Sequence, residues 1–155
     1  MKSKLDRRKR FGELSKEVER ATTECDYQRA RQGIEDIQRL TPLEPLMEDW
    51  LKTSQTDLQR LEETVRKAIA LINQAEAQTS QAEAAANATP PDENRVQQLA
   101  QQAAQALTQA DQIAPKCLRE RQKMEAIRQR LEALAKRKKP TITTSIILLI
   151  DTSGS

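Results

Sequence analysis

The chain has 155 residues, of which 37% are apolar and 32% charged, and its net charge is +3. It contains one Phe, one Tyr, one Trp and three Gly, a composition that argues against a β-sandwich or barrel and favours a thin helical bundle. The absence of His excludes Ser-His-Asp triads, Cys-His dyads and Cys₂His₂ zinc sites.

Two short helices are predicted before the first proline break. Apolar residues recur at spacings of three and four from Phe11 to Cys25, which places them on one face of a first helix. Asp26 is a candidate N-cap for a second helix, and Tyr27, Ala30, Ile34 and Ile37 would form its apolar face. Pro42 ends this helix, because proline lacks an amide donor and disfavours helix in the residue before it.

Two long helical arms follow, one on each side of a proline-rich turn at residues 87–92, and Asp92 is a candidate N-cap for the second arm. Apolar residues keep a four-three spacing from Met47 to Ala86 and again from Val96 to Leu134, as in a coiled-coil seam. The spacing continues through Pro115, which predicts a kink or a short break that preserves the face. We therefore expect an antiparallel hairpin whose strongest core lies between residues 43–65 and 118–134. A tetratricopeptide-type repeat is a weaker alternative, because the expected Gly and aromatic positions are missing.

Basic residues and cysteines suggest no site of their own. The basic runs at 2–10 and 136–139 can attract nucleic acid or anionic lipid, but only Phe11 could stack on a base. We therefore favour solvated helix ends over a nucleic-acid-associated helical protein, which stays open as a weaker alternative. Cys25 and Cys117 belong to no CxxC motif. A disulfide between them is possible in principle, but we expect two buried, reduced thiols that act as small hydrophobes.

No targeting or membrane-spanning segment is recognised. The basic N-terminus is not followed by the apolar stretch of a signal peptide, and the unbroken apolar run Ile146–Ile150 is too short to span a bilayer. We therefore expect a chain without a transmembrane segment, located in the cytoplasm.

The character of the sequence changes at Pro140. A β-branched stretch leads into Ile146–Ile150, which is typical of a strand buried on both faces, and Asp151-Thr152-Ser153-Gly154-Ser155 follows directly. This pattern resembles the first strand and first metal loop of a von Willebrand factor type A (VWA) domain. The resemblance implies a metal-ion-dependent adhesion site in which oxygens of Asp151, Ser153 and Ser155 bind Mg²⁺, a cation that prefers hard oxygen ligands.

Three other interpretations of the motif remain open. Aspartyl-phosphate phosphatases carry Asp-x-Asp after a similar strand, but Ser153 stands where the second carboxylate is needed. Aspartic proteases use Asp-Thr-Gly, whereas Ser153 separates Thr152 from Gly154. The third is an ordinary strand with a polar tail, since a short motif is always a hypothesis.

The resemblance covers residues 141–155 only. A complete VWA domain resembles a doubly wound α/β sheet, and its metal site takes a Thr and an Asp from two later loops that this sequence lacks. We therefore expect an all-α region at residues 1–139, a long antiparallel helical hairpin with additional N-terminal helices, followed at 140–155 by an orphan strand of a truncated VWA domain. Mg²⁺ affinity of this fragment alone should be weak or absent.

The expected function is binding rather than catalysis. The complete protein would bind a protein partner through its Mg²⁺ site, and the helical region would serve as a spacer or docking arm. The alternative is a stand-alone coiled-coil scaffold, whose apolar seams could also pair two chains into a homodimer. We expect no enzyme, because the carboxylates on the long helices lie among Arg and Lys at ion-pair spacing.

Overall fold

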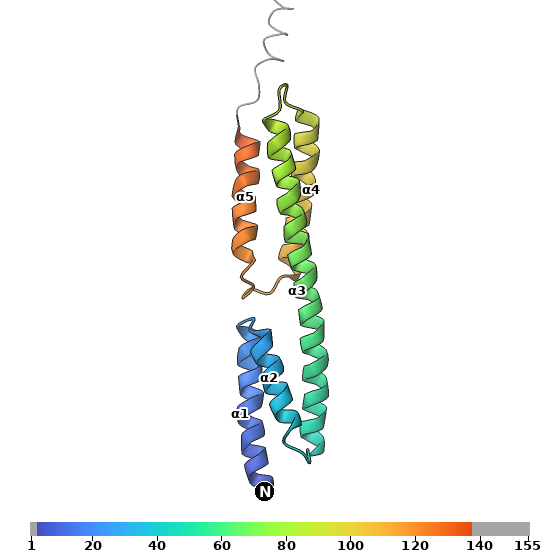
Figure 1. Cartoon of the computed structure of the whole chain (residues 1–155), viewed down its shortest axis with the longest axis vertical. Helices are drawn as coiled ribbons and strands as arrows, with labels where there is room; N and C mark the ends of the chain where they lie inside the picture. The colour runs from blue at the N-terminus through green and yellow to red at the C-terminus, as the bar shows by residue number, and fades with distance from the viewer. Residues whose placement is uncertain (1–2, 138–155) are drawn as a thin grey trace, which may run out of the picture. The chain divides into compact units, whose positions relative to one another are not determined.

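The computed structural model describes residues 3–137, and this part of the chain is all-helical (Figure 1). Its helices are α1 (Lys4–Thr23), α2 (Tyr27–Gln38), α3 (Pro45–Ala86), α4 (Glu93–Ile113) and α5 (Arg121–Lys136). The predicted all-α class is confirmed for these residues. The predicted strand at 140–155 lies outside them.

The helical region divides into two compact units. Among the described residues, the first contains 3–70 together with 110–121, and the second contains 71–109 and 122–137. Helix α3 thus contributes its N-terminal part to one unit and its C-terminal part to the other. Residues 3–137 of the helical region predicted at 1–139 therefore form two compact units.

Helix starts follow the capping residues of the sequence. The carboxylates of Asp26 and Asp92 accept hydrogen bonds from the amides of Arg29 (3.2 Å) and Arg95 (3.1 Å). These bonds satisfy amides that have no partner within the first turn of a helix. Helix α3 begins at Pro45, where proline loses no helix hydrogen bond because the first amides of a helix have no acceptor within it. Both sequence-predicted caps are confirmed.

The core of the first unit is built by α1, α2 and the start of α3. The predicted apolar faces of α1 and α2 are buried, and Phe11 packs edge-on against Trp50 of α3 with ring centroids 5.4 Å apart. Gly33 of α2 lies against α1, because a Cβ atom built at Gly33 would be 2.6 Å from Val18 Cγ2. Glycine at this position therefore permits the close approach of the two helices.

The second unit is a three-helix arrangement in which α5 runs parallel to α3. The Lys123 ammonium donates to Asn73 Oδ1 at 2.9 Å, and further along both helices Arg130 Nε donates to Glu83 Oε2 at 3.1 Å. Residue numbers thus rise together on the two helices. At the start of α4, Glu93 pairs with Arg137 at 2.6 Å.

The predicted antiparallel hairpin around residues 87–92 is confirmed for α3 and α4, where the Gln78 side-chain amide donates to Gln102 Oε1 at 3.4 Å. The predicted partner of α5 is wrong: Lys123 and Arg130 contact Asn73 and Glu83 in a parallel arrangement, not residues 43–65 in an antiparallel one. The second arm is two helices, because Pro115 cannot donate to the helix and the chain turns over residues 114–120. Within the turn, the Leu118 amide donates to the Pro115 carbonyl and the Arg121 amide to the Leu118 carbonyl, both at 3.1 Å.

The heptad seams are confirmed along most of their length, and they fail at this turn. Met47, Leu58 and Ile72 are buried on α3, and so are Val96 on α4 and Ile127 on α5. Ile113, by contrast, is 37% exposed, and Cys117 is exposed. Among the described residues, no helix has the length and apolar character needed to cross a membrane.

Candidate functional site

The three predicted Mg²⁺ ligands, Asp151, Ser153 and Ser155, lie outside the described residues. Their arrangement therefore stays a prediction. Within residues 3–137, no group of three or more His, Cys, Asp or Glu side chains is placed to hold a metal ion.

The described residues instead bring together the two cysteines. Cys25 and Cys117 form a disulfide across 92 residues of sequence, with Cα atoms 5.6 Å apart, a separation typical of such bonds. The prediction of two buried, reduced thiols was wrong. Cys25 is only partly buried and Cys117 is exposed, because each lies in a turn between helices rather than on a buried helical face.

Cys25 occupies a backbone position that usually belongs to glycine. Its φ is 60°, and it follows the C-cap Glu24 of α1. The Asp26 amide donates to the Ala21 carbonyl at 2.8 Å and the Cys25 amide to the Thr22 carbonyl at 3.1 Å, the two bonds of a Schellman motif. A side chain in this left-handed region costs free energy that glycine would avoid. This strained position is thus occupied by a cysteine whose sulfur is bonded to Cys117 in the turn between α4 and α5.

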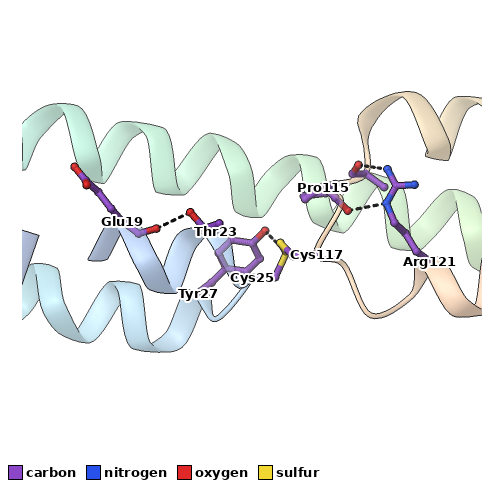
Figure 2. Close-up of a disulfide and its surroundings, with 8 residues drawn as sticks. Glu19, Thr23, Cys25, Tyr27, Pro115, Cys117 and Arg121 are labelled. Atoms are coloured by element: carbon purple, nitrogen blue, oxygen red, sulfur yellow. Dashed lines mark hydrogen bonds between the residues drawn. A yellow bond between two sulfur atoms is a disulfide. The ribbon is translucent and has the colours of Figure 1, made fainter. Parts of the chain in front are cut away.

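One hydroxyl group points at the disulfide (Figure 2). The Tyr27 hydroxyl donates to Cys25 Sγ at 3.3 Å. Partial burial, and to a lesser degree the nearby Glu62 carboxylate, raise the pKa of Tyr27, so the phenol stays protonated and remains a donor at neutral pH. The neighbouring Thr23 hydroxyl donates to the Glu19 carbonyl at 2.9 Å instead.

The Arg121 guanidinium stabilises the turn that carries Cys117 through hydrogen bonds to residues 111–115. Its Nε donates to the Pro115 carbonyl at 2.8 Å (Figure 2). Its Nη1 donates to Asp111 Oδ1 at 2.9 Å. A third guanidinium bond reaches the Ala114 carbonyl at 2.5 Å. Arg121 thus satisfies carbonyls at the C-terminal end of α4, where cations are favoured.

A second feature of the first unit is a half-open basic cavity of about 520 Å³. Arg7, Arg10 and Arg39 line it, with Leu14 and Leu40 among its apolar residues. Arg10 and Arg39 also form ion pairs with Glu13 (3.2 Å) and Asp36 (3.5 Å), whose exposed character makes them weak. Guanidinium groups beside apolar side chains can bind a carboxylate-bearing segment.

The second unit has a smaller apolar hollow of about 280 Å³ between α4 and α5. Val96 and Ala100 line it from α4, and Leu131 and Leu134 from α5. Arg137 and Glu93 stand at its edge as an ion pair.

Sequence reasoning missed the disulfide and the basic cavity for one reason. Both depend on residues from separate helices or turns meeting in space: Cys25 with Cys117, and Arg7 and Arg10 with Arg39. The positive φ position after α1 carries no sequence signal, because it lacks the usual glycine. No protein-family model, no curated protein and no solved structure matches the chain.

Proposed function

We propose that this chain is the helical N-terminal region of a VWA domain-containing binding protein. The complete protein would bind a protein partner through a Mg²⁺-dependent adhesion site that begins with Asp151, Ser153 and Ser155. The observation that carries the proposal is the apolar run Ile146–Ile150 followed directly by Asp-Thr-Ser-Gly-Ser. Function in this proposal is binding rather than catalysis, and Mg²⁺ serves as a bridge to a partner's carboxylate.

The helical part would act as a docking arm. Its support is the basic cavity of the first unit, whose lining includes three arginines, one carboxylate (Asp36) and apolar residues. An acidic segment of a partner protein matches the positive charge of the cavity. Its carboxylates would replace the weak, exposed ion pairs of Arg10 and Arg39 with bidentate contacts to the same guanidinium groups.

The test of the VWA proposal is the coding sequence beyond Ser155. We expect alternating strand and helix patterns that include a later Thr and a later Asp at strand ends. In a protein that includes this sequence, Mn²⁺ or Mg²⁺ titration should show binding that Asp151→Ala abolishes and Thr152→Ala leaves unchanged. Downstream sequence without any α/β pattern, or equal binding by both variants, would contradict the proposal.

A second candidate is a stand-alone helical scaffold, and the two buried cores of residues 3–137 favour it. In this case removal of residues 140–155 should leave partner binding and oligomeric state unchanged, as measured by light scattering coupled to size-exclusion chromatography. A homodimer that depends on residues 140–155 would contradict the scaffold.

We also propose a cytoplasmic location. Disulfides in that compartment are usually transient, catalytic or redox-sensing rather than structural. The proposed location therefore requires that the Cys25–Cys117 bond can be exchanged with cellular thiols.

A further inference from the structure

The two sulfur atoms of the disulfide lie in unequal surroundings. Cys117 is an exposed residue of the turn between α4 and α5, where a thiol can approach from solvent. Cys25 is partly buried and accepts the hydrogen bond from the Tyr27 hydroxyl at 3.3 Å. In thiol–disulfide exchange, the rate depends on which sulfur is accessible and on the acidity of the thiol that leaves.

We propose that Cys117 is a site of reversible modification by a low-molecular-weight thiol of the glutathione class. The thiolate of that molecule attacks Cys117 Sγ, a new S–S bond forms there, and the Cys25–Cys117 bond breaks. The electron pair of the broken bond stays on Cys25 as a thiolate. The step consumes one thiolate and releases one, so no outside oxidant or reductant is needed.

Tyr27 determines the direction of this exchange. Its hydroxyl already donates to Cys25 Sγ, and the same bond strengthens when Cys25 carries a negative charge. Since burial and Glu62 keep the phenol protonated, the donor is present at neutral pH. Cys25 is therefore the better leaving group, and Cys117 the sulfur that keeps the adduct.

Charge around Cys117 favours the same class of thiol. Lys116 precedes Cys117 and Arg119 follows two residues later, and both are exposed, as is Cys117 itself. Nearby cations attract a thiol that bears carboxylates and increase its rate of encounter. A second thiolate can displace the adduct, leaving both cysteines reduced, or Cys25 can attack Cys117 and restore the disulfide.

The first experiment maps the adduct on the unaltered chain. The oxidised protein is treated with limiting reduced glutathione, quenched in acid, alkylated and analysed by peptide mass spectrometry. We expect the glutathione on Cys117 and the alkyl group on Cys25, with at least about fivefold preference over the reverse, because Cys117 is the exposed residue and Cys25 is the better leaving group. Adducts on Cys25, or equal amounts on both, would overturn the proposal.

The second experiment measures the role of Tyr27. In Tyr27→Phe the rate of adduct formation should fall about three- to tenfold, the range expected when a leaving anion loses one hydrogen bond. Thr23→Val is the matched control, because its hydroxyl lies nearby but donates to Glu19, and its rate should equal that of the wild type. Far-UV circular dichroism confirms that both variants are folded. A Tyr27→Phe rate equal to that of the control would refute the role of Tyr27.

Discussion

The contact between α1 and α2 makes a sharp prediction for Gly33. A methyl group at this position would lie 2.6 Å from Val18 Cγ2 and 3.8 Å from the Leu14 carbonyl oxygen. Carbon atoms in good contact lie about 3.5–4.0 Å apart, so the first distance is too short by roughly 1 Å. Val18 is 5% exposed and β-branched, which leaves its side chain little freedom to move within a helix.

Two effects oppose each other in Gly33→Ala. Alanine in a helix interior gains about 0.5–1 kcal/mol over glycine, whereas overpacking of a core costs about 1–3 kcal/mol. We expect the second to dominate, with a net loss of about 1–2 kcal/mol in the free energy of unfolding. Gly12→Ala is the matched control: Gly12 lies inside α1, and a Cβ atom added there would have nothing within 4 Å, so this variant should gain about 0.5–1 kcal/mol.

The assay is urea unfolding followed by the fluorescence of Trp50. Trp50 is the single tryptophan and packs against the core of the first unit, so its signal reports on that unit. The double variant Val18→Ala/Gly33→Ala should lose less than the sum of its single substitutions, because removing the Val18 methyl groups removes the clash. If Gly33→Ala proves as stable as Gly12→Ala, the close approach of α1 and α2 is refuted.

Three further outcomes test other parts of the structure. With reductant present, Cys25→Gly should raise the free energy of unfolding by about 1 kcal/mol over the reduced wild type, since glycine accepts a φ of 60°. Cys25→Ala should leave that free energy unchanged, as measured by urea unfolding. Asp92→Ala should speed amide exchange in the first turn of α4 and cost about 1 kcal/mol, whereas Asp92→Asn should cost little. The Arg130 guanidinium lowers the pKa of Glu83, so this pair stabilises the fold above the unfolded-state pKa and its contribution disappears on acidification. Glu83 is 37% exposed, so the pair contributes little. The free energy of unfolding falls between about pH 6 and pH 3, and in Glu83→Gln this fall should be smaller by only a few tenths of a kcal/mol, measured by circular dichroism.

The local signals in the sequence were sufficient for individual helices. Capping carboxylates at Asp26 and Asp92 and the four-three spacing of α3 act within a few residues, and each is confirmed. The path of the chain after α4 was not predictable in the same way. Equal apolar spacing on both sides of Pro115 fits either a kinked helix or two helices, and the Arg121 contacts that accompany the turn carry no signal in that spacing.

The candidate site shows the same limit. Each cysteine seen alone resembles a small core residue at a seam position, and only the fold reveals that both lie in turns and meet. The resemblance at Asp151, Ser153 and Ser155 concerns residues outside the described part of the chain, so it stays a prediction.

The pairing of Cys25 with Cys117 supports the corrected path of the chain and the proposed thiol exchange. It is tested most directly by peptide mapping of protein purified without reductant and alkylated before digestion. Our account predicts one cross-linked pair of peptides, one containing Cys25 and the other Cys117, that separates only after reduction. Both cysteines recovered with the alkyl group, in protein never exposed to reductant, would contradict it.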